Sequence, residues 1–275
     1  MGPVDRVFVV VDRELRTLVR NRALVAVAVA FFAVVVGLGA LSRDAAGGYV
    51  SLTYDLLLVV EVLVPTIAFA FVFRSIRGDD ERGELDVIRT YPITRLEYVL
   101  GVFVGRVLGL LVVVLAAFGI AGALASGSGG APQTFLATHD AGDTVLVYVR
   151  FVLLTAIYTL VVAALALAVS AGTRTTRGAL AAAIGGVLVI AIGLDLALLT
   201  LVSSGAIGGN AIALFEGLSP ASAFRGLVFE LALGPALASE PGDGMASPLV
   251  ASLSLLVWLA LGLGMATVAV WQESA

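Results

Sequence analysis

The chain has 275 residues, of which 60% are apolar and only 13% are charged, and its formal net charge is −4. A soluble domain of this length could not bury so much apolar surface, because burial is limited by the ratio of surface to volume, and soluble chains carry about 25% charged residues. Cysteine is absent. The composition therefore excludes a soluble, a disordered and a disulfide-stapled protein, and it indicates a membrane protein.

Lysine is also absent, so all 16 basic residues are arginine. The phosphate-binding loop of P-loop ATPases needs a lysine that reaches the nucleotide phosphates, so this chain cannot be a conventional P-loop ATPase by itself. With one histidine and no cysteine, it also lacks the ligands of a Cys/His zinc site or a zinc protease. We expect no catalytic residue, no cofactor and no metal on this chain.

The first 22 residues have the pattern of an amphipathic helix. Apolar residues recur at intervals of four and three, which places them on one helical face, and four arginines fall on the other. The apolar set is Val4, Phe8, Val11, Leu15 and Leu18, and the basic set is Arg6, Arg13, Arg16 and Arg20. We expect residues 1–22 to lie flat among the cytoplasmic headgroups. The alternative is a solvent-exposed helix that only supplies charge.

Six stretches are long and apolar enough to cross a membrane, which takes about 20 residues. They are residues 23–41, 56–73, 98–125, 145–171, 179–202 and 249–271. The first is longer than the apolar region of a signal peptide, which has roughly 7–15 residues, so we expect it to remain as a span. The predicted fold class is all-α, a polytopic protein with six transmembrane helices.

The arginines predict the orientation, because short loops rich in Arg stay in the cytoplasm. Twelve of them precede the first span or lie between spans two and three or four and five, and two lie in the opposite loops. We therefore expect both termini in the cytoplasm and a multi-pass protein of the cell membrane.

The last outer segment, residues 203–248, differs from a solvated loop. Leu214, Phe215 and similar residues make it apolar, whereas Glu216 and Pro235 interrupt it too soon for a span. Irregular backbone at membrane depth is tolerated only where protein or a water-filled cavity surrounds it. We expect an extracytoplasmic re-entrant segment here.

Four ionisable residues fall inside the predicted spans, where they usually face the bundle interior and have partners. At about 1.5 Å per residue, Glu61, Arg150 and Asp195 lie roughly 7–11 Å from the outer boundary and could meet as one intramembrane polar cluster. This cluster could line a substrate path, or it could be an ion pair that locks helices together. Arg106 lies nearer the cytoplasmic end and could extend toward the headgroups.

The cytoplasmic segment 74–97 predicts a charged corner between spans two and three. Apolar residues within 85–88 predict a short helix, which Pro92 ends because the residue before a proline avoids helical geometry. Thr94 and Glu97 then form a capping box for the next helix. A rigid corner attached to two spans can transmit force from a soluble partner.

The residues of this segment also carry a family resemblance. They are Gly78, Glu81, Arg82, Gly83 and Leu85, then Tyr91-Pro92-Ile93-Thr94-Arg95, then Leu100-Gly101. In type and spacing they resemble the ABC-2 type permease family, the membrane subunits of ATP-driven transporters. Glu84 stands where that family commonly has Thr, and Val102 where it commonly has Lys; neither departure breaks the spacing.

A second match lies in the outer segment, where Pro220, Phe224 and Arg225 look like the N-P-x-x-A-[FY]-R motif of these permeases. Ser219 replaces the Asn of that motif. The outer loop after the first span is only about fourteen residues long. In this the chain is similar to the short-loop subgroup that includes the permease serving nitrous oxide reductase maturation.

The resemblance implies one permease domain over residues 1–275 that forms a substrate pathway as a dimer, with itself or with a related permease, and has no ATPase site. A separate ATPase subunit would hold ATP and Mg²⁺ and dock on residues 74–97; no nucleic acid is implied as a partner. The coupling residues would be Glu81, Arg82, Gly83, Glu84, Leu85, Tyr91, Pro92 and Arg95. Of these, Arg82, Glu84 and Arg95 would be available for ion pairs, and Leu85 and Tyr91, with Ile88, for apolar contact.

Two alternatives remain open at this point. A secondary transporter or channel would need no ATPase, but its usual inverted repeat is not evident, and a non-transporting assembly factor would need no polar cluster. Gly101, Gly105 and Gly109, spaced by four, allow close helix approach, either within the chain or at a dimer seam.

Overall fold

The structure is a computed structural model that describes residues 2–42, 48–125, 144–204, 219–236 and 247–271. These residues form helices joined by short connections, and no strand occurs among them. The helices are α1 (Pro3–Arg20), α2 (Arg22–Ser42), α3 (Gly48–Val72), α4 (Ser75–Glu81), α5 (Glu84–Arg89), α6 (Arg95–Ala125), α7 (Val145–Gly172), α8 (Thr176–Leu188), η1 (Val189–Gly193), α9 (Leu194–Ser203), α11 (Pro220–Leu227), η2 (Val228–Leu233), η3 (Gly234–Ala236) and α12 (Pro248–Ala269).

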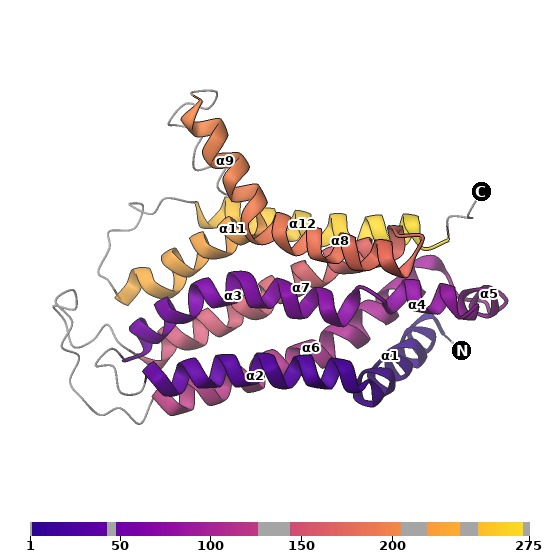
Figure 1. Cartoon of the computed structure of the whole chain (residues 1–275), viewed down its shortest axis with the longest axis horizontal. Helices are drawn as coiled ribbons and strands as arrows, with labels where there is room; N and C mark the ends of the chain where they lie inside the picture. The colour runs from indigo at the N-terminus through magenta and orange to yellow at the C-terminus, as the bar shows by residue number, and fades with distance from the viewer. Residues whose placement is uncertain (1, 43–47, 126–143, 205–218, 237–246, 272–275) are drawn as a thin grey trace.

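The long helices run side by side as one bundle (Figure 1). Helix α1 and the last residues of α12 lie at the same end, together with α4 and α5. We call this the α1 end of the bundle and the opposite end the far end.

The predicted spans are confirmed: within the described ranges, six helical segments are long and apolar enough to cross a membrane. The largest difference in limits is at α3, which begins at Gly48, whereas the sequence predicted a start at Leu56. The polar residues before Leu56 lower the hydropathy there, so the sequence did not reveal that the helix begins earlier. Thr53 is accommodated because its Oγ1 donates a hydrogen bond to the carbonyl oxygen of Tyr49 at 2.8 Å.

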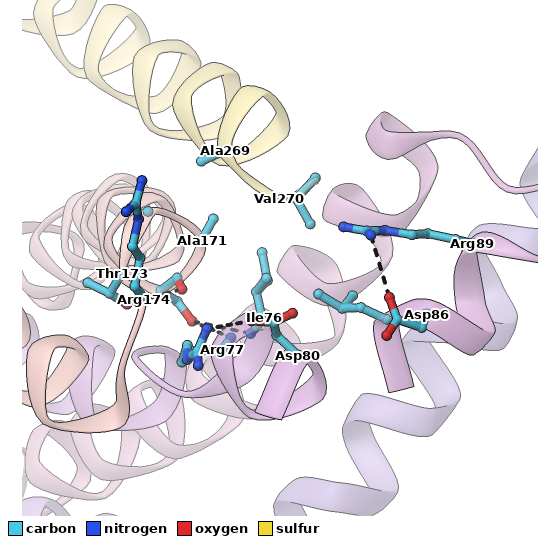
Figure 2. A pocket seen from close by; sticks show the side chains of 13 residues that line it. Ile76, Arg77, Asp80, Asp86, Arg89, Ala171, Thr173, Arg174, Ala269 and Val270 are labelled. Atoms are coloured by element: carbon cyan, nitrogen blue, oxygen red, sulfur yellow. Dashed lines mark hydrogen bonds and ion pairs between the residues drawn. The ribbon is translucent and has the colours of Figure 1, made fainter. Parts of the chain in front are cut away.

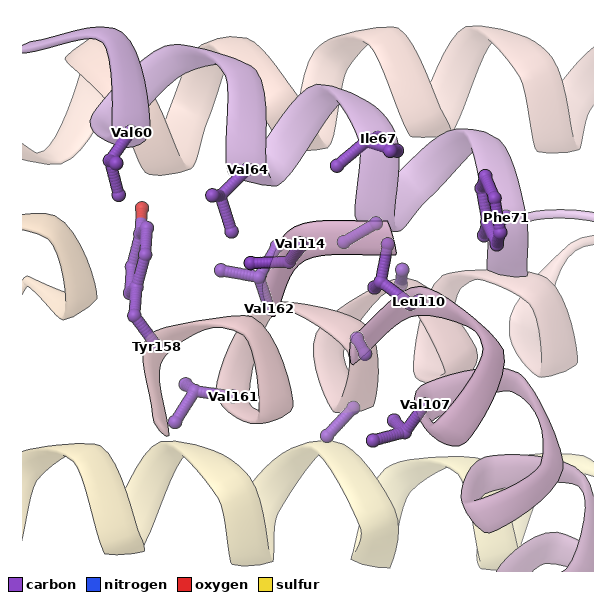
Figure 3. Packing of buried hydrophobic residues seen from close by; sticks show 14 of the residues in the cluster. Val60, Val64, Ile67, Phe71, Val107, Leu110, Val114, Tyr158, Val161 and Val162 are labelled. Carbon is purple, nitrogen blue, oxygen red and sulfur yellow. The ribbon is translucent and has the colours of Figure 1, made fainter. Parts of the chain in front are cut away.

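The core lies between α3, α6 and α7. Figure 3 shows Val60 and Val64 of α3 facing Val114 of α6 and Tyr158 and Val162 of α7. All five side chains are 1% exposed or less. Helices α3 and α7 are more buried than α2 and α12, which leaves the outer helices with apolar faces for lipid.

Helix α1 packs along α6 over the three glycines that were predicted to allow close approach. A Cβ atom at Gly101 would lie 2.6 Å from Cβ of Val10, and one at Gly105 would lie 2.6 Å from Cβ of Glu14. At Gly109 the nearest atom of α1 would be 2.5 Å away. Of the two interpretations left open by the sequence, the structure supports packing within the chain.

This packing covers only part of the apolar face of α1, the face that the sequence predicted to contact the membrane. Val11 and Leu18 are buried against the bundle, but Val4 and Phe8 are each 65% exposed. The placement of α1 among headgroups remains a prediction, and it concerns only the exposed part of that face.

Alanine at Gly105 is expected to lower the free energy of unfolding by about 1–3 kcal/mol, because the new methyl group overpacks the contact with α1. Gly119→Ala is the matched control on the same helix, since a Cβ there meets no atom within 4 Å. It should raise the free energy of unfolding by about 0.5–1 kcal/mol through helix propensity. Denaturation in detergent measures both, and shifts of the same sign would contradict the packing of α1 on α6.

The fifth span runs from Thr176 to Ser203, and its two halves, α8 and α9, point in different directions (Figure 1). Its centre, η1, has π-helical geometry, and a π turn bends an α-helix. Beyond it, α9 leans away from the other long helices (Figure 1). Asp195 lies in the first turn of α9, so the bend sets the position of this carboxylate.

Candidate functional site

The charged corner between the second and third spans consists of α4, α5 and the turn before α6. Gly83 joins α4 to α5 with φ +69°, a left-handed conformation that glycine adopts without strain. The predicted capping box is confirmed at the start of α6. The backbone N–H of Thr94 donates to Glu97 at 2.8 Å, and the backbone N–H of Glu97 donates to Oγ1 of Thr94 at 3.2 Å.

A buried carboxylate, Asp79 of α4, holds the corner to its neighbours. Tyr98 of α6 donates its hydroxyl proton to Asp79 at 2.7 Å, and Arg82 donates at 2.6 Å. Arg13 of α1 also donates to Asp79 and approaches Glu84 at 3.4 Å. Asp79 is only 3% exposed. The corner, α1 and the start of α6 are therefore joined through one side chain.

Glu84 and Arg82 pair with each other at 2.6 Å. The hydrogen bond from Arg82 lowers the pKa of the Glu84 carboxyl below its usual value, and the same bond raises the pKa of Arg82. The sequence predicted both side chains to be available for ion pairs with a partner. In the structure both charges are paired within the chain, because Asp79, Arg82 and Glu84 lie on adjacent turns, and ion pairs with a partner stay a prediction.

Arg106 of α6 does not extend toward the headgroups, which the sequence had left possible, and it has a structural role instead. It is 8% exposed and donates from Nε to Glu14 of α1 at 2.7 Å and from Nη1 to the carbonyl oxygen of Phe71 at 3.0 Å. Glu14 is 2% exposed. Because Gly105 has no Cβ atom, α1 comes close enough for this buried pair to form.

The predicted coupling residues fall into an exposed and a covered group. Tyr91 is 65% exposed, and Gly83 and Pro92 are also exposed. Leu85 is 2% exposed, so its side chain is covered by the chain itself and is not presented for the apolar contact that the sequence predicted. Val87, which was not predicted as a coupling residue, is 58% exposed on the same helix.

The two remaining coupling residues contact other parts of the chain. Glu81 accepts hydrogen bonds from the backbone N–H and the hydroxyl of Thr176, which tie α4 to the start of α8. The guanidinium of Arg95 lies 5.4 Å from the ring centre of Trp271, beyond the end of α12. Thus the corner also reaches spans five and six.

The predicted intramembrane cluster forms with a different arginine. Arg225 of α11 donates to both carboxylate oxygens of Glu61, at 2.6 and 2.8 Å, and to Asp195 at 3.0 Å. Ser222 also donates to Asp195 at 2.6 Å. Arg150 is not a member: it donates to the carbonyl oxygen of Leu231 at 3.2 Å and pairs with no carboxylate in the described ranges. We call Glu61, Asp195 and Arg225 the far-end triad.

The outer motif places Arg225. Ser219 caps α11 by accepting a hydrogen bond from the backbone N–H of Ser222 at 3.4 Å, and Pro220 follows in the first turn. Phe224 is fully buried and stacks on Tyr158 of α7 with ring centres 4.8 Å apart. Because Phe224 is held in this position, the neighbouring Arg225 lies between α3 and α9, where it reaches Glu61 and Asp195. The sequence showed this motif but did not indicate how deep α11 lies in the bundle. The pairing of Arg225 with Glu61 and Asp195 was therefore not predicted.

Six apolar spans with a braced, charged corner between the second and third define a multi-pass membrane protein of the transporter permease class. The chain belongs to the ABC-2 family of transporter proteins, which it matches over residues 8–272. The resemblance found in the sequence is thereby confirmed.

Two curated relatives are both named "Probable ABC transporter permease protein NosY". The one from Stutzerimonas stutzeri is 34% identical over 123 residues, and the one from Pseudomonas aeruginosa (strain PAO1) is 33% identical over 120 residues. The matched segments cover 43% and 42% of this chain and 45% and 44% of the relatives. The chain thus matches less than half the length of these two relatives.

Proposed function

We propose that the chain is the permease subunit of an ATP-driven transporter, that it forms the substrate pathway as a dimer, and that a separate ATPase subunit docks on the α4–α5 corner. ATP and Mg²⁺ would be held by that subunit, and the chain itself would have no catalytic residue. The α1 end would face the cytoplasm, as the arginine distribution predicts.

The observation that supports docking is the exposure of two apolar side chains on an otherwise charged corner. Val87 and Tyr91 project from α5 and the following turn and are 58% and 65% exposed. Tyrosine is one of the side chains that dominate the energetics of protein interfaces, and Val87 would add apolar contact beside it. Arg82 and Glu84 pair with each other at 2.6 Å, so docking would rest mainly on these two apolar residues.

The same corner would transmit movement. Asp79 joins it to α1 and α6, and Ser170 at the end of α7 accepts hydrogen bonds from the backbone N–H groups of Ile76 and Arg77 at 3.2 and 3.3 Å. A push on Tyr91 would therefore move these elements as a rigid body.

Two further parts of the proposal concern the membrane. The exposed residues Val4 and Phe8 would bring the N-terminal helix against the headgroups. Residues 203–248 would form the re-entrant segment. The support is that α11 and η2 carry buried apolar side chains, and that Arg225 of α11 pairs with Glu61 and Asp195. The parts of this segment at 205–218 and 237–246 lie outside the described residues.

Docking is tested by affinity purification of the tagged chain from its own cells in detergent, with ATP hydrolysis measured in the eluate. The wild type should recover an ATP-hydrolysing subunit in equal amount. Tyr91→Ala combined with Val87→Ser should weaken that association about thirtyfold, as loss of about 2 kcal/mol from an interface anchor predicts.

The matched control is Val19→Ser on α1, an apolar residue at the same end of the bundle that is 79% exposed. It should recover as much ATPase as the wild type does. Recovery of none by the wild type, or equal losses in both variants, would contradict the proposal.

A further inference from the structure

A polar cleft of about 490 Å³ opens at the α1 end of the bundle. Figure 2 shows its walls: Ala269 and Val270 of the sixth span on one side, Arg77 of α4 on the opposite side, Arg89 of α5, and Arg174 just beyond α7. Two of the candidate spans end here, at Gly172 and Ala269. The cleft therefore lies at the level where the headgroups of a bilayer begin.

The cleft has a surplus of positive charge. Three arginines and two aspartates line it. Arg77 pairs with Asp80 and approaches Glu81 at 3.4 Å, and Arg89 approaches Asp86 at a long 3.5 Å. Arg174 is exposed and forms no ion pair with the residues that the structure describes. Since each guanidinium has five N–H donors, the cleft retains donors for an anion, and arginine binds phosphate through two parallel bonds.

A second cavity, of about 420 Å³, borders the cleft. Gly172 and Ala269 line both cavities. The walls of the second cavity are otherwise apolar, with Phe69, Leu165 and Trp258 among them. Trp258 precedes Ala269 by eleven residues, or roughly 16 Å at 1.5 Å per residue. That depth is about one leaflet, half of a hydrocarbon core roughly 30 Å thick.

We propose that the two cavities form one binding site for an anionic phospholipid, with the phosphate in the cleft at Arg89 and Arg174 and one acyl chain in the apolar cavity. The charge surplus disfavours a neutral headgroup, and the apolar continuation distinguishes a lipid from a free phosphate. Basic pockets between membrane helices bind acidic headgroups in this way. The lipid would lie between the sixth span and the α4–α5 corner.

The first test compares two lipids with the same palmitoyl and oleoyl chains, phosphatidylglycerol and phosphatidylcholine, by native mass spectrometry of the purified full chain in mild detergent. Phosphatidylglycerol should bind at least tenfold more tightly. Arg89→Gln with Arg174→Gln should reduce its affinity to that of phosphatidylcholine, whereas Arg20→Gln, an exposed arginine of α1, should not. Equal binding of both lipids, or equal loss in the control, would overturn the proposal. So would displacement of the lipid by millimolar glycerol 3-phosphate, which would show a soluble anion site.

The second test blocks the junction of the cavities. A Cβ at Gly172 meets no atom within 4 Å, so Gly172→Leu should fold normally and place its side chain where the two cavities join. It should weaken binding of both lipids at least tenfold. Gly37→Leu is the control. Gly37 lies on a different helix, α2, and a Cβ there also meets no atom within 4 Å, so this variant should bind lipid as the wild type does. Unchanged binding in Gly172→Leu would overturn the proposal. Neither test uses an ATPase, so this proposal and the proposed function fail independently.

Discussion

Replacement of Glu14 by alanine is expected to lower the free energy of unfolding by about 3–5 kcal/mol, the cost of removing one partner of a buried ion pair. Arg106 would keep its hydrogen bond to Phe71 but would lose its carboxylate 2.7 Å away. Its charge would then remain uncompensated among apolar neighbours. Unfolding of the purified chain in detergent, followed by circular dichroism or tryptophan fluorescence, measures the effect.

Asp12→Ala provides the control on the same helix. Asp12 pairs with Arg16, but the two side chains are 59% and 71% exposed, and exposed pairs contribute about 0–1 kcal/mol. The double variant Glu14→Leu with Arg106→Met should recover most of the lost stability, because apolar residues often replace a buried pair without loss. If Glu14→Ala and Asp12→Ala were equally stable, the buried pair between α1 and α6 would be disproved.

The second large effect is expected at the far-end triad. Arg225→Met would leave Glu61, whose side chain is 6% exposed, and Asp195 without their shared cation. Like charges left at low exposure destabilise the folded state. We expect a loss of about 3 kcal/mol, the lower end of the range for a broken buried pair, because Arg225 itself remains partly exposed. The same unfolding experiment measures it.

Arg150→Met is the matched control, since Arg150 lies inside the fourth span and, among the residues that the structure describes, donates to the carbonyl oxygen of Leu231 but to no carboxylate. It should cost less than about 1 kcal/mol, the usual net value of one hydrogen bond. Neutralising the whole triad with Glu61→Gln, Asp195→Asn and Arg225→Gln should restore part of the stability lost in Arg225→Met. If Arg150→Met lost more unfolding free energy than Arg225→Met, Arg150 and not Arg225 would be the partner of the two carboxylates.

The sequence predicted the features that depend on local pattern. Continuous apolar stretches predicted the six helices, and the spacing of Thr94 and Glu97 predicted the cap at the start of α6. The family was predicted from the residues between Gly78 and Gly101. Each of these signals lies within about thirty residues of the chain, where periodicity and turn chemistry are sufficient.

The pairing of distant residues could not be predicted in this way. Residue counting placed Arg150 at the depth of Glu61, but depth alone says nothing of which helix face an arginine occupies. The partner, Arg225, lies 164 residues after Glu61 in a segment whose depth no hydropathy pattern defines. Leu85 was misjudged for a similar reason, because a short amphipathic helix such as α5 presents two faces and only tertiary packing decides which is covered.

The contact of α1 with α6 has a consequence for biosynthesis. Glu14 leaves the ribosome 92 residues before Arg106, and at about 5–20 residues per second this is a delay of roughly 5–20 s. During that interval the glycines that receive α1 do not yet exist in the nascent chain. The first helix to be made thus cannot reach its packing partner until the third span has been made, and it must keep a carboxylate in water until then.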